Sequence, residues 1–155
     1  MNVEHCFPED LARGKSRIAE GGAAVREGVA FLLECKAQYA SDPSAEGGVN
    51  CSTALNKGMK WLQEHPYECL GVASGASSGA IRKAYHKSAL SYHPDKNPHT
   101  GLLFQTIQEA YTLLSDDASR EKFDAKMRRR NEELERLRKR KAGNDRGGGG
   151  GGGGG

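Results

Sequence analysis

Three side chains that could take part in acid–base or metal chemistry lie close together near residue 95. His93, Asp95 and His99 fall within the ten-residue stretch SYHPDKNPHT. An imidazole near a carboxylate is a pairing used for proton transfer and for metal binding. These side chains belong to one exposed turn for which the sequence indicates no pocket. We therefore expect no catalytic residue, no bound metal and no cofactor here, and an enzyme is the least favoured of three interpretations.

A basic helix is predicted to run directly into this turn. Residues 76–92, ASSGAIRKAYHKSALSY, contain no acidic side chain. Ser77 suits an N-cap, which predicts a helix over residues 78–92, and Pro94 ends it because the residue before a proline avoids the α region. The apolar face of this helix carries Ile81, Ala84, Tyr85, Ser88, Ala89 and Tyr92. The opposite face carries Arg82, Lys83, His86 and Lys87.

A second amphipathic helix is predicted after the turn. The stretch LFQTIQEAYTLL places five side chains at helical spacing, namely Phe104, Ile107, Ala110, Tyr111 and Leu114. Two such helices joined by a short turn should pack antiparallel. The preceding PYECLGV is a short apolar turn that includes Leu70, with Pro66 suited to a first helical position. The following SREKFD begins a further helix that includes Phe123.

These segments together resemble the J domain of DnaJ-type co-chaperones. The resemblance covers residues 66–127, from PYECLGV through AIRKAYHKSALSYHPDKNP and FQTIQEAYTLLSD to SREKFD. It implies an all-α fold of four helices, in which the second and third form an antiparallel hairpin with the HPD tripeptide at its tip. It also implies a protein that binds heat shock protein 70 (Hsp70) in its ATP state and stimulates its ATP hydrolysis, without being an enzyme itself.

The resemblance assigns roles residue by residue. The stimulating loop would be His93, Pro94 and Asp95. The docking face would be Arg82, Lys83, His86, Lys87 and Lys96. The core of the domain would comprise Leu70, Ile81, Ala84, Tyr85, Ala89, Tyr92, Phe104, Ile107, Ala110, Tyr111, Leu114 and Phe123.

Several residues depart from the family pattern. Ser88 stands where the family usually has a core Leu, a loss that we expect to cost about 2 kcal/mol of stability. His86 replaces a commoner Arg, so that one docking charge depends on pH. The segment after Asp95 is short, and the third helix is expected to begin near Thr100. The four cysteines form no CxxC pair, which suggests a miscellaneous J protein without a zinc-binding region.

The remaining segments are assigned by composition. Residues 1–64 are expected to form a small helical region of unknown role, residues 65–127 the J domain, residues 128–146 a basic helical extension and residues 147–155 a disordered polyglycine tail. Residues 126–141 hold nine Lys or Arg against three Glu, a charge of +6 in a chain of net charge +3. Such asymmetry indicates an electrostatic partner. The alternative interpretation is therefore a degenerate J-like module that binds RNA, a ribosome or an acidic protein through this tail.

Partners and location follow from the same features. The expected partner is Hsp70, while the client protein cannot be identified. Neither a membrane-spanning stretch of about 18 apolar residues nor a secretory signal is apparent, which favours a cytoplasmic protein. The run RKRK at residues 138–141 is also compatible with entry into the nucleus.

Overall fold

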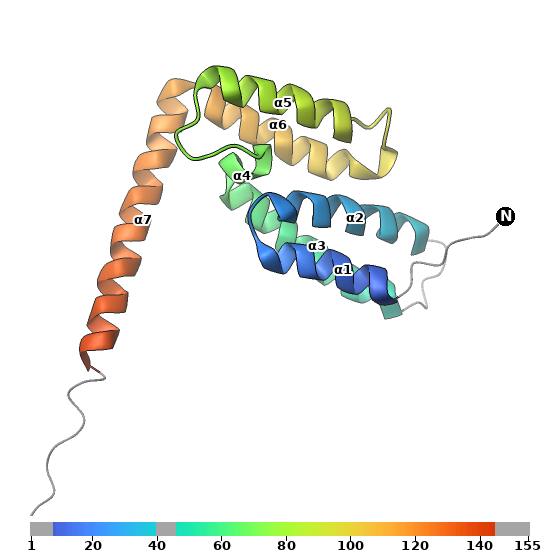
Figure 1. The fold of residues 1–155 in the computed structure, drawn as a ribbon, viewed down its shortest axis with the longest axis horizontal. Helices are drawn as coiled ribbons and strands as arrows, with labels where there is room; N and C mark the ends of the chain where they lie inside the picture. The colour runs from blue at the N-terminus through green and yellow to red at the C-terminus, as the bar shows by residue number, and fades with distance from the viewer. Residues whose placement is uncertain (1–7, 40–45, 145–155) are drawn as a thin grey trace, which may run out of the picture. The chain divides into compact units, whose positions relative to one another are not determined.

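The computed structural model describes residues 8–39 and 46–144, and all of the regular secondary structure over these residues is helical (Figure 1). Their helices are α1 (Pro8–Glu20), α2 (Ala23–Tyr39), α3 (Glu46–Glu64), α4 (Pro66–Leu70), α5 (Ser78–Tyr92), α6 (Gly101–Ser115) and α7 (Asp117–Asn144), with a short 3-10 turn, η1 (Pro98–Thr100), before α6. The predicted all-α class is confirmed. The chain divides into two compact units between residues 116 and 117.

Helices α1, α2 and α3 pack against one another at close range because glycines lie at their contacts. A Cβ atom on Gly28 of α2 would lie 3.0 Å from the backbone oxygen of Gly14 in α1. A Cβ atom on Gly58 of α3 would lie 2.6 Å from Val29 of α2. The sequence predicted a small helical region over residues 1–64, and the structure forms α1, α2 and α3 within residues 8–39 and 46–64. Gly58, which has no side chain, allows α3 to approach α2.

The core of these three helices continues into the next three. Among α2 and α3, the fully or nearly fully buried apolar side chains are Val25, Val29, Leu32, Leu33, Cys35, Leu55 and Leu62. Helix α2 lies against α4, η1 and α6, and α3 lies against α4 and α6. Figure 1 shows the two groups of helices side by side. The N-terminal helices therefore share a core with the segment that carries the HPD turn.

Helices α5 and α6 form the predicted antiparallel hairpin (Figure 1). Tyr85 of α5 stacks on Tyr111 of α6, with ring centroids 4.1 Å apart and nearly parallel planes. The fully buried side chains of this hairpin are Ile81, Leu103, Ile107 and Leu114, which α4 supplements with Leu70. Leu103 was missing from the predicted face, and Phe104, placed on that face, is only half-buried. The buried positions of α6 follow the spacing 103, 107, 110 and 114.

Local signals fix where α5 begins and ends. The Ser77 side chain accepts a hydrogen bond from the backbone N–H of Ala80 at 3.3 Å, which caps the helix as predicted. His93 has φ −63° and ψ 135°, an extended conformation of the kind favoured before a proline. Gly71, which ends α4, has a φ of 76°, a left-handed conformation that suits glycine.

Helix α7 is continuous from Asp117 to Asn144 and passes the predicted boundary after residue 127 without a break. All side chains from 128 to 143 are exposed, and Phe123 of this helix is half-buried. The polyglycine segment lies outside the described residues. None of the helices within the described ranges is long and apolar enough to cross a membrane.

Candidate functional site

The backbone of the HPD turn is held by the carbonyl oxygen of His93. The backbone N–H groups of Lys96 and Asn97 donate to this oxygen at 3.0 and 2.9 Å. Pro94, which follows His93, has no backbone N–H that needs a hydrogen-bond partner, and its ring fixes the φ angle. The turn that connects α5 to η1 is therefore a closed, hydrogen-bonded loop rather than an open connection.

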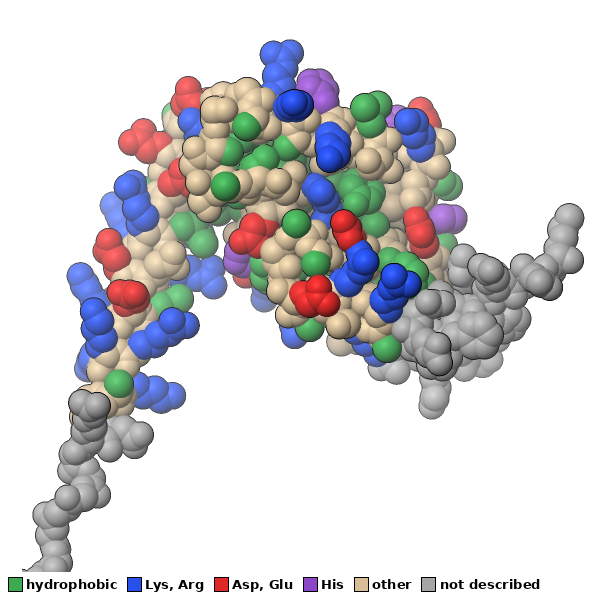
Figure 2. Space-filling view, in the orientation of Figure 1, with side chains coloured by type: hydrophobic (Ala, Val, Ile, Leu, Met, Phe, Trp, Pro, Cys, Tyr) green, Lys and Arg blue, Asp and Glu red, His purple; other side chains and the backbone are tan. Residues whose placement is uncertain are grey.

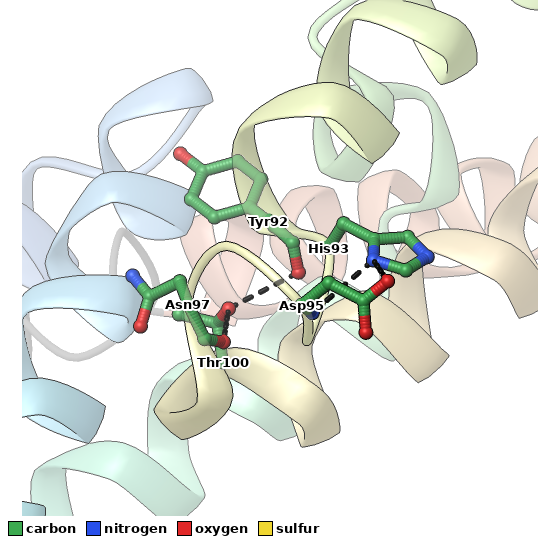
Figure 3. A network of polar contacts seen from close by, with 5 residues as sticks. All are labelled: Tyr92, His93, Asp95, Asn97 and Thr100. Carbon is green, nitrogen blue, oxygen red and sulfur yellow. Dashed lines mark hydrogen bonds and ion pairs between the residues drawn. The ribbon is translucent and has the colours of Figure 1, made fainter.

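Thr100 locks this turn onto the end of α5 (Figure 3). Its side chain is fully buried. Its Oγ1 lies 3.1 Å from the carbonyl oxygen of Tyr92 and 2.9 Å from that of Asn97, and its backbone N–H donates to the Asn97 oxygen at 3.2 Å. The Tyr92 carbonyl belongs to the last turn of α5, where carbonyls lack helical partners. The sequence indicated Thr100 only as a helix start, and no local pattern signalled this role.

The His93 imidazole is oriented by its neighbours on both sides. The Asp95 backbone N–H donates to Nδ1 at 3.2 Å, and an Asp95 carboxylate oxygen lies 3.5 Å from the same nitrogen. The ring meets Phe104 edge-on, with centroids 5.3 Å apart. In the neutral ring, an Nδ1 that accepts a hydrogen bond leaves the proton on Nε2, which can then donate. The His93 and Asp95 side chains are 46% and 89% exposed, so a partner can reach both.

The predicted cationic residues lie on one exposed surface beside the turn, and we call Arg82, Lys83, His86, Lys87 and Lys96 the α5 cationic face. All five side chains are exposed. Figure 2 shows basic and histidine side chains projecting along the edge that α5 forms. A shallow hollow on this edge is lined by His86, Ala89, Leu90, His93, Asp95 and Lys96. His86 and Lys96 of the α5 cationic face therefore meet His93 and Asp95 of the HPD turn in one hollow.

Leu90 is the residue of this surface that the sequence interpretation missed. Its side chain is 65% exposed and lies in the hollow between His86 and His93. The signal was available, since Leu90 interrupts the polar side of an otherwise amphipathic helix. An exposed leucine beside charged groups gives the surface an apolar contact as well as electrostatic attraction.

The opposite side of the hairpin is covered by α2, and its key residue is Arg26. The Arg26 Nη1 donates to the carbonyl oxygen of Cys69 at 3.1 Å and to Ser88 Oγ at 3.0 Å. The guanidinium also lies over the Tyr92 ring, 5.7 Å from its centroid. Ser88 was expected to be a simple loss of apolar bulk. It is instead a buried hydroxyl with a charged donor, because α2 supplies Arg26.

Arg26 also affects the neighbouring thiol. Burial raises the pKa of Cys69 to about 12, from an ordinary value of 9.0, while the positive charge of Arg26 acts in the opposite direction. The thiol is therefore neutral at physiological pH and acts as a small apolar group in the core.

The predicted core residues fall into two groups. Leu70, Ile81, Ile107, Ala110 and Leu114 are buried. Half-buried side chains are those of Ala84, Tyr85, Ala89, Tyr92, Phe104, Tyr111 and Phe123, the last of which belongs to the second unit. Within residues 8–39 and 46–144, no three His, Cys, Asp or Glu side chains are placed to hold a metal ion, and this includes His93, Asp95 and His99.

Comparison with known proteins identifies the segment that carries this site. The family model described as the DnaJ domain matches residues 65–124. Over 58 residues the chain is 52% identical to DnaJ homolog subfamily A member 4 of Homo sapiens, an alignment that covers 37% of this chain and 15% of that protein. It is 50% identical over 58 residues to DnaJ homolog subfamily A member 2 of Rattus norvegicus, covering 37% of this chain and 14% of that protein.

The chain thus spans about one seventh of the length of these curated relatives, with the similarity confined to the HPD-bearing segment. No solved structure matches the chain. The family match, the helical hairpin and the HPD turn at its tip coincide in the same residues. We conclude that residues 65–124 of this chain form a DnaJ domain.

Proposed function

We propose that this chain is a co-chaperone that binds Hsp70 in its ATP state and stimulates its ATP hydrolysis. The observation that carries the proposal is the HPD turn, closed by Thr100 and flanked by the exposed α5 cationic face. The hydrolysis takes place in the partner, and this chain supplies contacts rather than catalytic groups. Its effect depends on making better contacts with one state of the partner than with the other.

The α5 cationic face supplies the attraction in this proposal. Several exposed cations on one helix face accelerate the encounter with an acidic surface, and salt weakens the attraction. The hollow beside them places Leu90 where it can contact an apolar group of the partner. We therefore expect the complementary surface of Hsp70 to be acidic, with an apolar spot near its centre.

The HPD turn supplies the specific contacts. The Nε2–H of His93 is available as a donor because Nδ1 already accepts from the Asp95 backbone. The Asp95 carboxylate is exposed and suits an arginine or backbone N–H groups of the partner. A turn that is closed before binding needs no further ordering to present these groups in the geometry that stimulates hydrolysis.

A single-turnover measurement of ATP hydrolysis by Hsp70 tests the proposal with the full chain. The wild type should accelerate hydrolysis, and the His93→Gln variant should not. His99→Gln is the matched control, because His99 is an exposed histidine of the adjoining η1 turn, outside the HPD tripeptide. Equal acceleration by wild type and His93→Gln would overturn the proposal.

We further propose a weaker electrostatic contact of α7 with RNA or a ribosome. It is supported by the exposure of every side chain from 128 to 143, a stretch rich in Arg and Lys. Such contacts are with phosphates, so the dissociation constant should rise steeply with salt. RNA binding by the full chain that is independent of salt concentration would contradict this contact.

A further inference from the structure

The HPD turn has two faces, of which one is exposed and the other is in contact with α2. Figure 3 shows His93 and Asp95 pointing to one side, and Tyr92 and Asn97 pointing to the side where α2 runs. The first face is exposed. The second is in contact with a helix from outside the DnaJ domain, at two separate points.

The first contact fastens the outer end of the turn. The side chain of Asn97 donates to a Glu34 carboxylate oxygen at 2.8 Å, across 63 positions of sequence. Asn97 is also the residue whose backbone N–H donates to the His93 carbonyl and whose carbonyl accepts from Thr100. A bond to Glu34 therefore restrains the residue at the centre of the hydrogen-bond network of the turn.

The second contact fastens α5 just before the turn. Arg26 bonds to Ser88, one helical turn before Tyr92, and its guanidinium lies over the Tyr92 ring. Tyr92 also lines a groove on α1 and α2 together with Phe31 and Glu34. Arg26 and Glu34 are eight residues apart in one helix, a separation of about 12 Å along its axis. Helix α2 thus spans the distance from the middle of α5 to the far side of the turn.

We infer that α2 is a positioning element for the HPD turn, acting through Arg26 and Glu34. The predicted consequence for Hsp70 stimulation rests on the proposed function. The positioning of the turn by α2 does not depend on that function. The part of the chain that presents His93 and Asp95 to the partner is therefore larger than the DnaJ domain. The role of α2 is to hold the turn in its closed form before Hsp70 binds.

Variants of Glu34 separate this role from a general loss of stability. Glu34→Ala removes the acceptor for Asn97. Glu34→Gln keeps an acceptor oxygen and should behave as the wild type. Glu27→Ala is the matched control, because Glu27 lies seven residues, about two turns, earlier on α2 and is paired with Arg17 of α1 rather than with a residue of the turn.

Hydrogen exchange of backbone N–H groups in the free full chain is the primary measurement. The relevant groups are those of Lys96, Asn97 and Thr100, which are all hydrogen-bonded within the turn. Glu34→Ala should accelerate their exchange about two- to fivefold, as expected for the loss of one exposed hydrogen bond. Arg26→Met should also accelerate it, while Glu34→Gln and Glu27→Ala should not. Unchanged exchange in Glu34→Ala would overturn the inference.

Stimulation of Hsp70 is the second measurement. Glu34→Ala should lower the maximal stimulated rate and leave the half-saturating concentration unchanged, because the α5 cationic face is intact. A raised half-saturating concentration with an unchanged maximum would contradict positioning of the turn. If the wild type gave no stimulation, the proposed function would fail, and the exchange rates would still decide whether α2 holds the turn.

Discussion

The hydroxyl of Ser88 accepts a hydrogen bond from the guanidinium of Arg26 at 3.0 Å, and this bond joins α2 to the helix that precedes the HPD turn. When α5 is considered alone, the buried serine is only a loss of apolar volume. With Arg26 present, its hydroxyl is the acceptor for a charged donor. Arg26 Nε is buried and has no hydrogen-bond partner among the described residues, so the cation depends on Ser88 and on the Cys69 carbonyl.

This pairing predicts that restoring an apolar residue is harmful. Ser88→Leu should lower the free energy of unfolding by about 1–3 kcal/mol, because the leucine displaces Arg26 and leaves its N–H groups without an acceptor. In an Arg26→Met background the same substitution should be neutral or stabilising, since two apolar side chains then meet. Urea unfolding of the wild type, the two single variants and the double variant measures the coupling. A stabilising Ser88→Leu in the wild-type background would show that Arg26 is not held by Ser88.

Thr100 is predicted to stabilise the turn through its hydroxyl. Thr100→Val keeps the shape but removes the donor shared by the carbonyls of Tyr92 and Asn97. It should lower the free energy of unfolding by about 1–2 kcal/mol, since a buried carbonyl loses its partner. Thr112→Val is the control, because the Thr112 hydroxyl bonds the Gln108 carbonyl on an exposed surface. Similar thermal midpoints for the two variants would contradict a specific role for Thr100.

The buried thiol of Cys69 predicts a loss of stability at alkaline pH. Its pKa is raised to about 12 in the folded chain and is 9.0 ordinarily. Its contribution to stability is therefore fully present below pH 9.0 and is lost as the pH rises towards 12, because only the unfolded state can ionise easily. Cys69→Ala lacks this contribution. The stability difference between wild type and Cys69→Ala should shrink between pH 8 and pH 10.5, and a constant difference would refute the prediction.

The α5 cationic face predicts salt-dependent binding to Hsp70. Lys83→Glu and Lys87→Glu should each weaken binding by roughly two- to fivefold at low salt, as expected for the loss of one exposed ion pair. The difference from wild type should fade at high salt because exposed charges are then screened. Lys57→Glu, at an exposed position of α3, is the matched control. Equal weakening by all three variants would indicate a net-charge effect rather than a docking face.

Much of the site could be predicted from local sequence. The spacing of apolar residues placed α5 and α6, Ser77 and Pro94 set the limits of α5, and the exposed cations followed from the same helix. Such signals act over a few residues, and because the turn after α5 is short, they were sufficient to predict it as well. The assignment of Phe104 rather than Leu103 to the buried face shows how a shift of one position changes a helical stripe.

The contacts of α2 could not be predicted in this way. Arg26 and Ser88 are 62 positions apart, and Glu34 and Asn97 are 63 apart. Which side chains meet over such separations depends on how α2 packs on α4, η1 and α6. A single sequence contains the residues of these contacts but no periodic pattern that pairs them.

The central claim is that the HPD turn stimulates ATP hydrolysis by Hsp70 and that the α5 cationic face supplies the attraction between the two proteins. The most direct test is the single-turnover rate of ATP hydrolysis as a function of the concentration of the full chain. We predict that His93→Gln abolishes the maximal acceleration, whereas Lys83→Glu raises the half-saturating concentration and leaves the maximum intact. If His93→Gln instead changed only the half-saturating concentration, the turn would be a binding contact without a role in stimulation, and the account would be contradicted.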